Sequence, residues 1–188
     1  MTEQQLTIAV IGAGGKMGMR VSNNLQRSSH LVRYAENSPG GQQRTTEAGR
    51  TVTDSAEAVA GADVVILAVP DVALGPVSSA LVTELDPGTI VLTLDPAAAY
   101  ANLLYQRADV EYAVAHPCHP SVFLQRKTEA ELNDTFGGIA APQEVVVKHP
   151  SATSPLMSHP SHLLQTVLPL AALKRATAAG HGAATLRR

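Results

Sequence analysis

The sequence predicts an α/β fold built on a doubly wound, mostly parallel sheet. Two observations support this fold class. Short apolar segments with the composition of buried strands alternate with segments of helical character, and a glycine-rich turn joins the first strand to the first helix. The strands are expected at residues 6–11, 31–35, 51–53, 63–69, 89–94, 110–115 and 143–147.

The first crossover contains the pattern GxxGxxG, formed by Gly12, Gly15 and Gly18. Bare backbone in such a turn can approach a pyrophosphate, and the amides that start the next helix can bind its negative charge. The turn therefore predicts a Rossmann-type dinucleotide site. The cofactor-binding residues expected in it are Gly12, Ala13, Gly14, Gly15, Lys16, Met17 and Gly18. The alternative is a glycine-rich turn without a ligand, and a P-loop is disfavoured because Lys16 is followed by Met17.

An acidic residue after the second expected strand also indicates a nucleotide. Glu36 follows strand 31–35, about where dinucleotide sites carry a carboxylate. Such a carboxylate can accept hydrogen bonds from an adenosine ribose and repel a 2′-phosphate, which favours NAD over NADP. Two alternatives stay open: Glu36 is a solvated loop acid, or NADP binds with the help of Arg44.

The clearest buried strand, 63–69, ends in Pro70 and Asp71. The carboxyl ends of such strands face the ligand crevice, so both residues are expected near the cofactor, although Asp71 is equally consistent with a plain helix-start acid. A helix is expected to start at Gly75 and Pro76, since proline suits a first helical turn. The composition of 37–41 predicts a turn. Residues 128–131 fit a capping box.

Two histidines follow the last clear strand, 110–115. His116 and His119 stand at the expected ligand edge of the sheet, and histidine titrates in the range that suits a base for hydroxyl oxidation. They are the expected catalytic residues; the alternative is that one or both bond the backbone. A metal held by these histidines and Cys118 is disfavoured because no second pair of ligands lies at zinc-site spacing. Nothing in the sequence indicates a nucleophilic role for Cys118.

Composition narrows the class of protein. The net charge of −2 gives no reason to expect a nucleic-acid partner. The single cysteine excludes an internal disulfide framework, and no apolar run reaches the length of a membrane span. The expectation is a soluble cytoplasmic protein without a membrane partner.

The chain is expected to divide into a dinucleotide-binding domain, residues 1–147, and an atypical basic tail, residues 148–188. The tail contains no Asp or Glu and several prolines. We expect it to be weakly ordered, and a basic tail could also contact an acidic partner. Its basic residues are Lys148, Lys174, Arg175, Arg187 and Arg188.

Four segments together carry a family likeness. They are VIGAGGKMG at 10–18, DVVILAVPD at 63–71, GTIVLTLDPAA at 88–98 and AHPCHPSVF at 115–123. In this order they resemble the NAD-binding domain of the 6-phosphogluconate dehydrogenase-like superfamily, and within it the D-apionate oxidoisomerase group, also labelled decarboxylating phosphogluconate dehydrogenase-like. The likeness covers residues 6–147.

The resemblance implies an NAD-dependent oxidoreductase that acts on a CH–OH group of a small branched sugar acid, with oxidation coupled to isomerisation. It also implies a homodimer whose second, all-helical domain completes the active site. On matching positions, residues 12–18, Glu36 and Asp71 would bind the cofactor, and His116 and His119 would face the substrate.

Two departures from the family matter. The chain has no lysine in the helical KxxxN pattern of 6-phosphogluconate dehydrogenases proper, which disfavours that activity. The residues after Val147 do not resemble the all-helical domain of the family, so we expect a truncation or a reading frame shifted near Lys148. A dimer is then expected of the full-length family rather than of this chain. The alternative function is a catalytically inactive NAD(P)-binding module.

Overall fold

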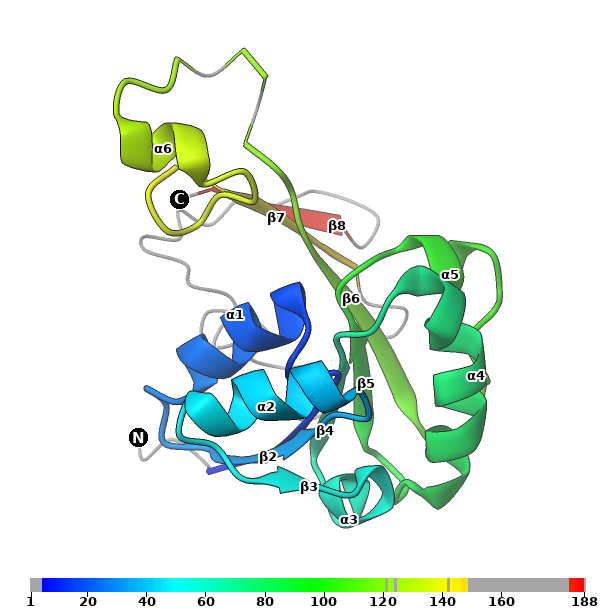
Figure 1. The fold of residues 1–188 in the computed structure, drawn as a ribbon. Coiled ribbons are helices and arrows are strands. Elements are labelled where there is room, and N and C mark those ends of the chain that lie inside the picture. Colours follow the sequence, from blue (N-terminus) through cyan, green and yellow to red (C-terminus); the bar gives the residue numbers. More distant parts are fainter. Residues whose placement is uncertain (1–4, 121, 124, 142, 149–182, 188) are drawn as a thin grey trace.

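The computed structural model describes residues 5–120, 122–123, 125–141, 143–148 and 183–187. They form an eight-stranded sheet with helices on both faces (Figure 1). The strands are β1 Thr7–Ile11, β2 Leu31–Ala35, β3 Val52–Thr53, β4 Val64–Leu67, β5 Ile90–Thr93, β6 Glu111–Pro117, β7 Glu144–Lys148 and β8 Ala183–Arg187.

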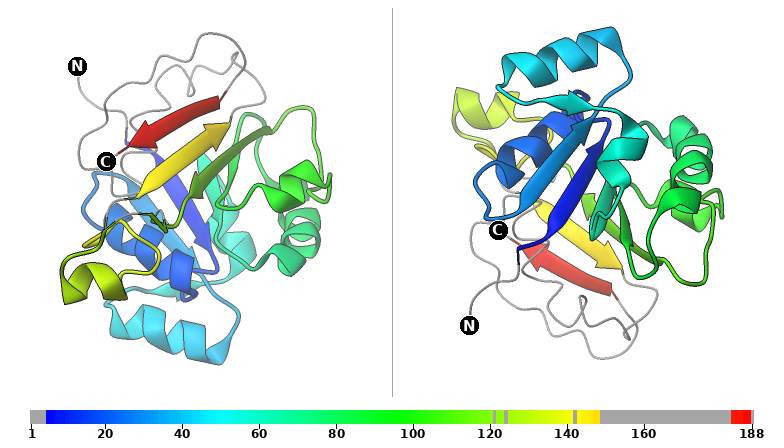
Figure 2. Two further views of the ribbon diagram at one scale, coloured as in Figure 1. Left: turned by 90° about the horizontal axis from the view of Figure 1, so that it is seen from above. Right: turned by 90° about the horizontal axis from the view of Figure 1, so that it is seen from below.

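The sheet has the order β3-β2-β1-β4-β5-β6-β7-β8. The pairs from β3 to β6 are parallel, whereas β7 pairs antiparallel with β6 and with β8 at the edge seen in Figure 2. The predicted doubly wound, mostly parallel sheet is therefore confirmed. The chain runs outward from β1 to β3 and then returns to the other side of β1, so the carboxyl ends of β1 and β4 flank the point at which such folds bind ligands.

The helices cover both faces of the sheet. Figures 1 and 2 show α1 and α2 on one face and α3, α4 and α5 on the other. A short α6 follows β6, and a 3₁₀ turn, Val82–Glu84, follows α4. The helices are α1 Lys16–Leu25, α2 Pro39–Glu47, α3 Ser55–Val59, α4 Asp71–Leu81, α5 Ala97–Tyr100 and α6 Glu129–Asn133.

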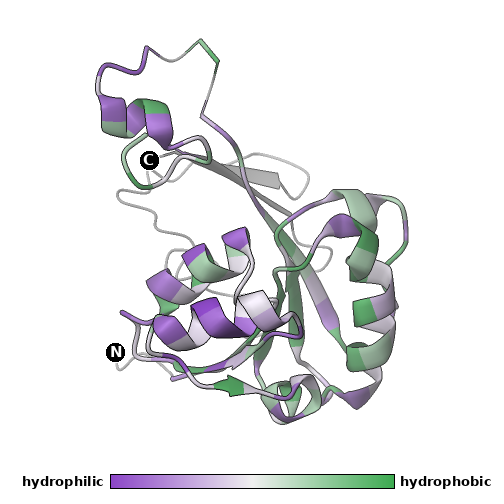
Figure 3. Cartoon of the chain, in the orientation of Figure 1, coloured by the Kyte–Doolittle hydropathy of each residue, from purple (hydrophilic) through white to green (hydrophobic). Residues whose placement is uncertain are grey.

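Each face of the sheet has its own hydrophobic core. Ile8 and Val10 of β1 pack with α1 on one face, and Ala9 and Ile11 pack with α3 and α4 on the other. This alternation is why the central strands read as continuous apolar runs, since both faces of a parallel sheet are covered. Figure 3 shows hydrophobic residues concentrated on the central strands and α4, with hydrophilic residues prominent on α2 and α6.

Two predicted boundaries are wrong. Helix α4 begins at Asp71 rather than at Gly75, with Pro76 inside it. Burial of Leu74 in the second core offsets the hydrogen bond that Pro76 cannot donate. Residues 37–41 are not a simple turn, because α2 begins at Pro39 and the Ser38 hydroxyl caps it by accepting the N–H of Gly41 at 3.2 Å.

One further local prediction, the capping box, is confirmed. Thr128 and Glu131 form the expected capping box of α6, in which the Glu131 N–H bonds the Thr128 hydroxyl at 3.2 Å and the Thr128 N–H bonds the Glu131 carboxylate at 2.9 Å.

Of the tail, β8 and Lys148 are described; the predicted weak order of the rest lies outside the described residues. No helix in the described ranges is both long and apolar enough to span a bilayer.

Candidate functional site

Gly12 follows β1 in a conformation that favours glycine. Its φ is +82°, and a Cβ atom there would lie 2.7 Å from the Ala68 carbonyl oxygen. The N–H groups of Gly12 and Ala13 donate to the Ala35 carbonyl at 2.9 and 3.1 Å, which ties the turn to the end of β2. Ala13 is fully buried, so it supports the turn from below rather than facing a ligand.

Gly14 faces α2. Its N–H donates to Glu36 Oε2 at 2.9 Å, and its carbonyl accepts from Arg44 Nε at 2.9 Å. A Cβ atom on Gly14 would overlap the Gly41 backbone. Gly14 is thus required for the approach of α2 to the turn, and the Arg44 side chain is engaged with this backbone.

Gly15 starts helix α1 and faces a cavity. It is the N-cap residue, with φ −71° and no side chain to bond the first-turn amides, and the first turn carries no acidic residue. Lys16 adds a positive charge at the first helical position. A helix N-terminus of this kind favours anions. Gly18, one turn later, lets α1 approach β1, because a Cβ atom there would overlap the Gly12 carbonyl.

The Glu36 carboxylate is held in place by hydrogen bonds. Partial burial acts to raise its pKa, but bonds from the Ser38 N–H and hydroxyl, both at 2.9 Å, and from the Gly14 N–H outweigh it and bring the pKa below its usual value. Glu36 is therefore ionised at neutral pH, at the mouth of the turn.

Two cavities flank the glycine turn. The larger, about 410 Å³, lies at the carboxyl ends of β4, β5 and β6. The smaller, about 190 Å³, includes Gly12 and Glu36 in its lining. Val69 lines both, so the two cavities adjoin across the end of β4.

The larger cavity gathers most of the predicted site residues. Its polar lining comes from α1, from the start of α4, and from the chain at and just beyond the ends of β5 and β6. Asp71 lines the larger cavity and is also the first residue of α4. The interpretation as a residue near the cofactor and the interpretation as a helix-start acid are therefore compatible. The predicted residues that line it are Gly15, Lys16, Met17, Pro70, Asp71, His116 and His119. Ala13, Gly14 and Gly18 line neither cavity, and support the turn instead.

His116 lies near the end of β6. Its Nδ1 is 3.0 Å from the Leu94 carbonyl oxygen and 3.8 Å from Asp95 Oδ2. Because a carbonyl can only accept, Nδ1 carries the hydrogen in this contact, which leaves Nε2 as the acceptor of the neutral ring. His116 can therefore bond the backbone through Nδ1 and still act in the site through Nε2.

His119 has the same arrangement on a different carbonyl. Its Nδ1 is 2.9 Å from the Thr135 carbonyl oxygen, and its ring centroid is 5.0 Å from that of Phe136. Nε2 is again the acceptor in the neutral ring. Cys118, between the two histidines, has its Sγ 3.8 Å from the His116 carbonyl oxygen. Within the described part of the chain, no group of three or more His, Cys, Asp or Glu side chains is arranged to hold a metal ion.

Sequence reasoning missed several residues that line the cavities, among them Val69, Asp95 and Phe136. Val69 joins the two cavities, Asp95 lies beside His116, and Phe136 comes from the loop after α6. Asp95 follows a buried strand, and that position could have marked it as a site residue. No sequence signal marks Phe136, because a loop far along the chain brings it to the site.

Comparison with known proteins identifies relatives of this arrangement. A sequence family described as NADP oxidoreductase coenzyme F420-dependent matches residues 7–96. D-apionate oxidoisomerase from Pectobacterium atrosepticum is 54% identical over 79% of this chain and 52% of its own length. The same enzyme from Cupriavidus necator is 43% identical over 81% of this chain and 53% of its own length.

A solved structure shows the same fold. The semialdehyde dehydrogenase NAD-binding protein from Cupriavidus necator, crystallised with calcium and NAD, has a TM-score of 0.78 and 37% identity, over 88% of this chain and 60% of that chain. The chain spans about half the length of the D-apionate oxidoisomerases it matches.

Proposed function

Because this chain contains the NAD(P)-binding Rossmann domain of the 6-phosphogluconate dehydrogenase-like family, we propose that it binds NAD across the two adjoining cavities and oxidises a CH–OH group of a small branched sugar acid. The observation that carries the proposal is that Val69 lines both cavities and that the N-terminus of α1, which favours anions, lies at the larger one. The adenosine half then belongs in the 190 Å³ cavity and the reacting half in the 410 Å³ cavity.

The residues present fit a dinucleotide. The diphosphate would bind at the turn of residues 12–18, where Gly15 leaves the first-turn amides of α1 uncapped by a side chain, while Ala13, Gly14 and Gly18 would support the turn. Pro70 and Asp71 would border the reacting half at the start of α4. NAD, when bound, supplies the acceptor for the hydride that leaves the substrate carbon.

Glu36 supports NAD as the preferred cofactor. Its carboxylate is ionised at neutral pH, lines the smaller cavity and would repel a 2′-phosphate. Arg44, which could favour NADP, donates through Nε to the Gly14 carbonyl. We expect Glu36→Gln to narrow the preference for NAD over NADP, measured as the ratio of the two dissociation constants by calorimetry.

His116 or His119 would act as the base. Each has Nδ1 on a backbone carbonyl, so the neutral ring keeps Nε2 as a proton acceptor at the larger cavity. Proton removal from the substrate hydroxyl by Nε2 would leave an imidazolium. Asp95 Oδ2, 3.8 Å from His116 Nδ1, is placed to stabilise that charge.

For the substrate, the proposal is a branched sugar acid, with oxidation coupled to isomerisation as the name of the D-apionate oxidoisomerases indicates. The second candidate is an NAD(P)-binding module without catalysis. The chain spans about half the length of these relatives.

Calorimetric titration with NAD, followed by an assay with D-apionate, separates the candidates. Turnover that disappears in His116→Gln and His119→Gln, with NAD affinity kept within about twofold, supports the enzyme. NAD binding without turnover supports the module. Failure to bind either dinucleotide contradicts both.

A further inference from the structure

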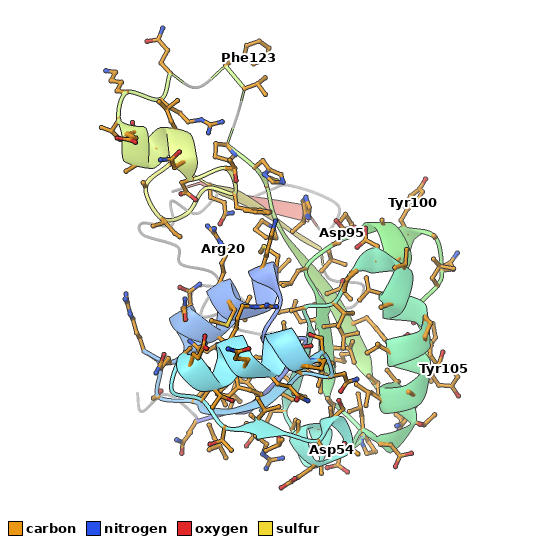
Figure 4. The ribbon with its side chains drawn as sticks, viewed as in Figure 1. Arg20, Asp54, Asp95, Tyr100, Tyr105 and Phe123 are labelled. Atoms are coloured by element: carbon orange, nitrogen blue, oxygen red, sulfur yellow. The ribbon has the colours of Figure 1, made fainter. Side chains whose placement is uncertain are left out.

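Arg20 connects the dinucleotide helix to the loop after α6. Its guanidinium donates to the Gly137 carbonyl, lies 3.5 Å from Asp134 Oδ1, and sits 5.6 Å from the centroid of the Phe136 ring. Figure 4 shows Arg20 extending from α1 toward this loop. Three of the four residues in segment 134–137 therefore contact one side chain.

The same segment contacts His119. The Thr135 carbonyl accepts from His119 Nδ1 at 2.9 Å, and the Phe136 ring packs on the imidazole with centroids 5.0 Å apart. Contacts to Arg20 and to His119 thus interleave along the segment. Phe136 takes part in both and also lines the larger cavity.

The segment is internally braced. Asp134 Oδ2 accepts the N–H groups of the three residues 139–141, at 2.9, 2.9 and 3.1 Å, and the Phe136 carbonyl accepts from Gln143 Nε2 at 2.7 Å. Asp134 is buried, with 6% of its side chain exposed. A segment braced in this way keeps its own shape, so its position on α1 depends on what holds it there.

We propose that Arg20 is a positioning residue, which holds segment 134–137 against α1 and thereby fixes His119 and Phe136 at the wall of the larger cavity. The inference rests on the proposed function, in which His119 faces the substrate. Helix α1 begins at the predicted diphosphate site and carries Arg20 just over one turn later. A single rigid helix would then set the spacing between cofactor and His119, which matters because small misplacements of reacting groups are costly.

The test compares three variants of the full chain. Arg20→Met removes the charge and the planar donors but keeps the stem, Arg20→Lys keeps the charge without the planar fork, and Arg27→Met is the control, since Arg27 is an exposed arginine just beyond the same helix. The primary measurement is the set of nuclear Overhauser effects between the ring protons of His119 and Phe136.

We expect these effects to disappear in Arg20→Met, to persist in Arg27→Met and to return in part in Arg20→Lys, while the His116 ring signals stay in place. Where the chain turns over substrate, kcat in Arg20→Met should fall about tenfold with KM for NAD nearly unchanged. If a folded Arg20→Met protein keeps the full nuclear Overhauser effects between the His119 and Phe136 rings, the proposal is overturned.

If Arg20→Met does not fold, Arg20→Lys decides, and undiminished effects in that variant overturn the proposal. Failure of the unmodified chain to bind NAD would contradict the proposed function, and the ring contacts would still test the role of Arg20.

Discussion

Gly18→Ala should destabilise the fold even though alanine is the better helix former. A Cβ atom at position 18 would overlap the Gly12 carbonyl oxygen and lie 2.8 Å from Gly12 C and 2.9 Å from Ala13 C. These are backbone atoms, and they cannot rotate away. The Gly12 N–H is bonded to Ala35 at 2.9 Å and its carbonyl accepts from Gly15 at 3.1 Å, so the turn cannot retreat without losing hydrogen bonds.

The magnitude follows from two opposing effects. Replacing glycine within a helix gains about 1 kcal/mol of helix propensity. Overpacking costs about 1–3 kcal/mol and occasionally more. The cost should fall at the high end here, because moving α1 away from β1 also loosens the packing of Val21 and Leu25, which are 0% and 1% exposed. We expect a net loss of about 2 kcal/mol, and a melting temperature lower by roughly 4–8 °C.

Gly40→Ala is the matched control. Gly40 lies in the first turn of α2, and the nearest atom to its added Cβ is Arg44 Nη1, at 3.4 Å, the end of a flexible side chain. This change should leave stability unchanged or raise it by up to about 1 kcal/mol. Urea and thermal unfolding followed by circular dichroism measure both variants. A Gly18→Ala protein as stable as the unmodified chain would refute the close-approach argument.

Three further outcomes are expected. Asp134 accepts three backbone N–H groups; burial acts to raise its pKa, but these bonds, with the charge of Arg20, lower it overall. The stability it contributes is therefore fully present above its ordinary pKa and lost as pH falls through the lowered native pKa. Asp134→Asn should cost about 1–3 kcal/mol at pH 7, and urea midpoints should converge with those of the unmodified chain in acid; a constant difference would contradict this. Thr128→Ala removes the cap of α6 and should speed amide exchange there, with the global midpoint hardly moved. Gly15→Ala places a methyl group at the larger cavity, 3.3 Å from the Gly12 carbonyl oxygen. It should raise the dissociation constant for NAD about tenfold, measured by calorimetry. If it lowers the free energy of unfolding as much as Gly18→Ala does, the two glycines have the same structural role.

Patterns local in the chain could be predicted from the sequence. The apolar run of β1, the glycine turn and the α1 periodicity depend on neighbours within a few residues, and so does the α6 capping box. The expected positions of Glu36 at the end of β2 and of His116 near the end of β6 follow from the strand assignments. Parallel strands place such residues at one edge of the sheet, which is why a candidate site could be located at all.

Contacts between distant segments were decided by the tertiary structure alone. Helix α4 keeps Pro76 inside it, and its Leu74 is buried in the second core. The hydrogen bond of Gly14 to Glu36, and the Phe136 loop that brings Arg20 and His119 to one ring, join residues far apart in the chain. Residue type and spacing determine which groups can bind a nucleotide, whereas packing across the sheet determines which of them meet, because those contacts depend on the whole chain being folded.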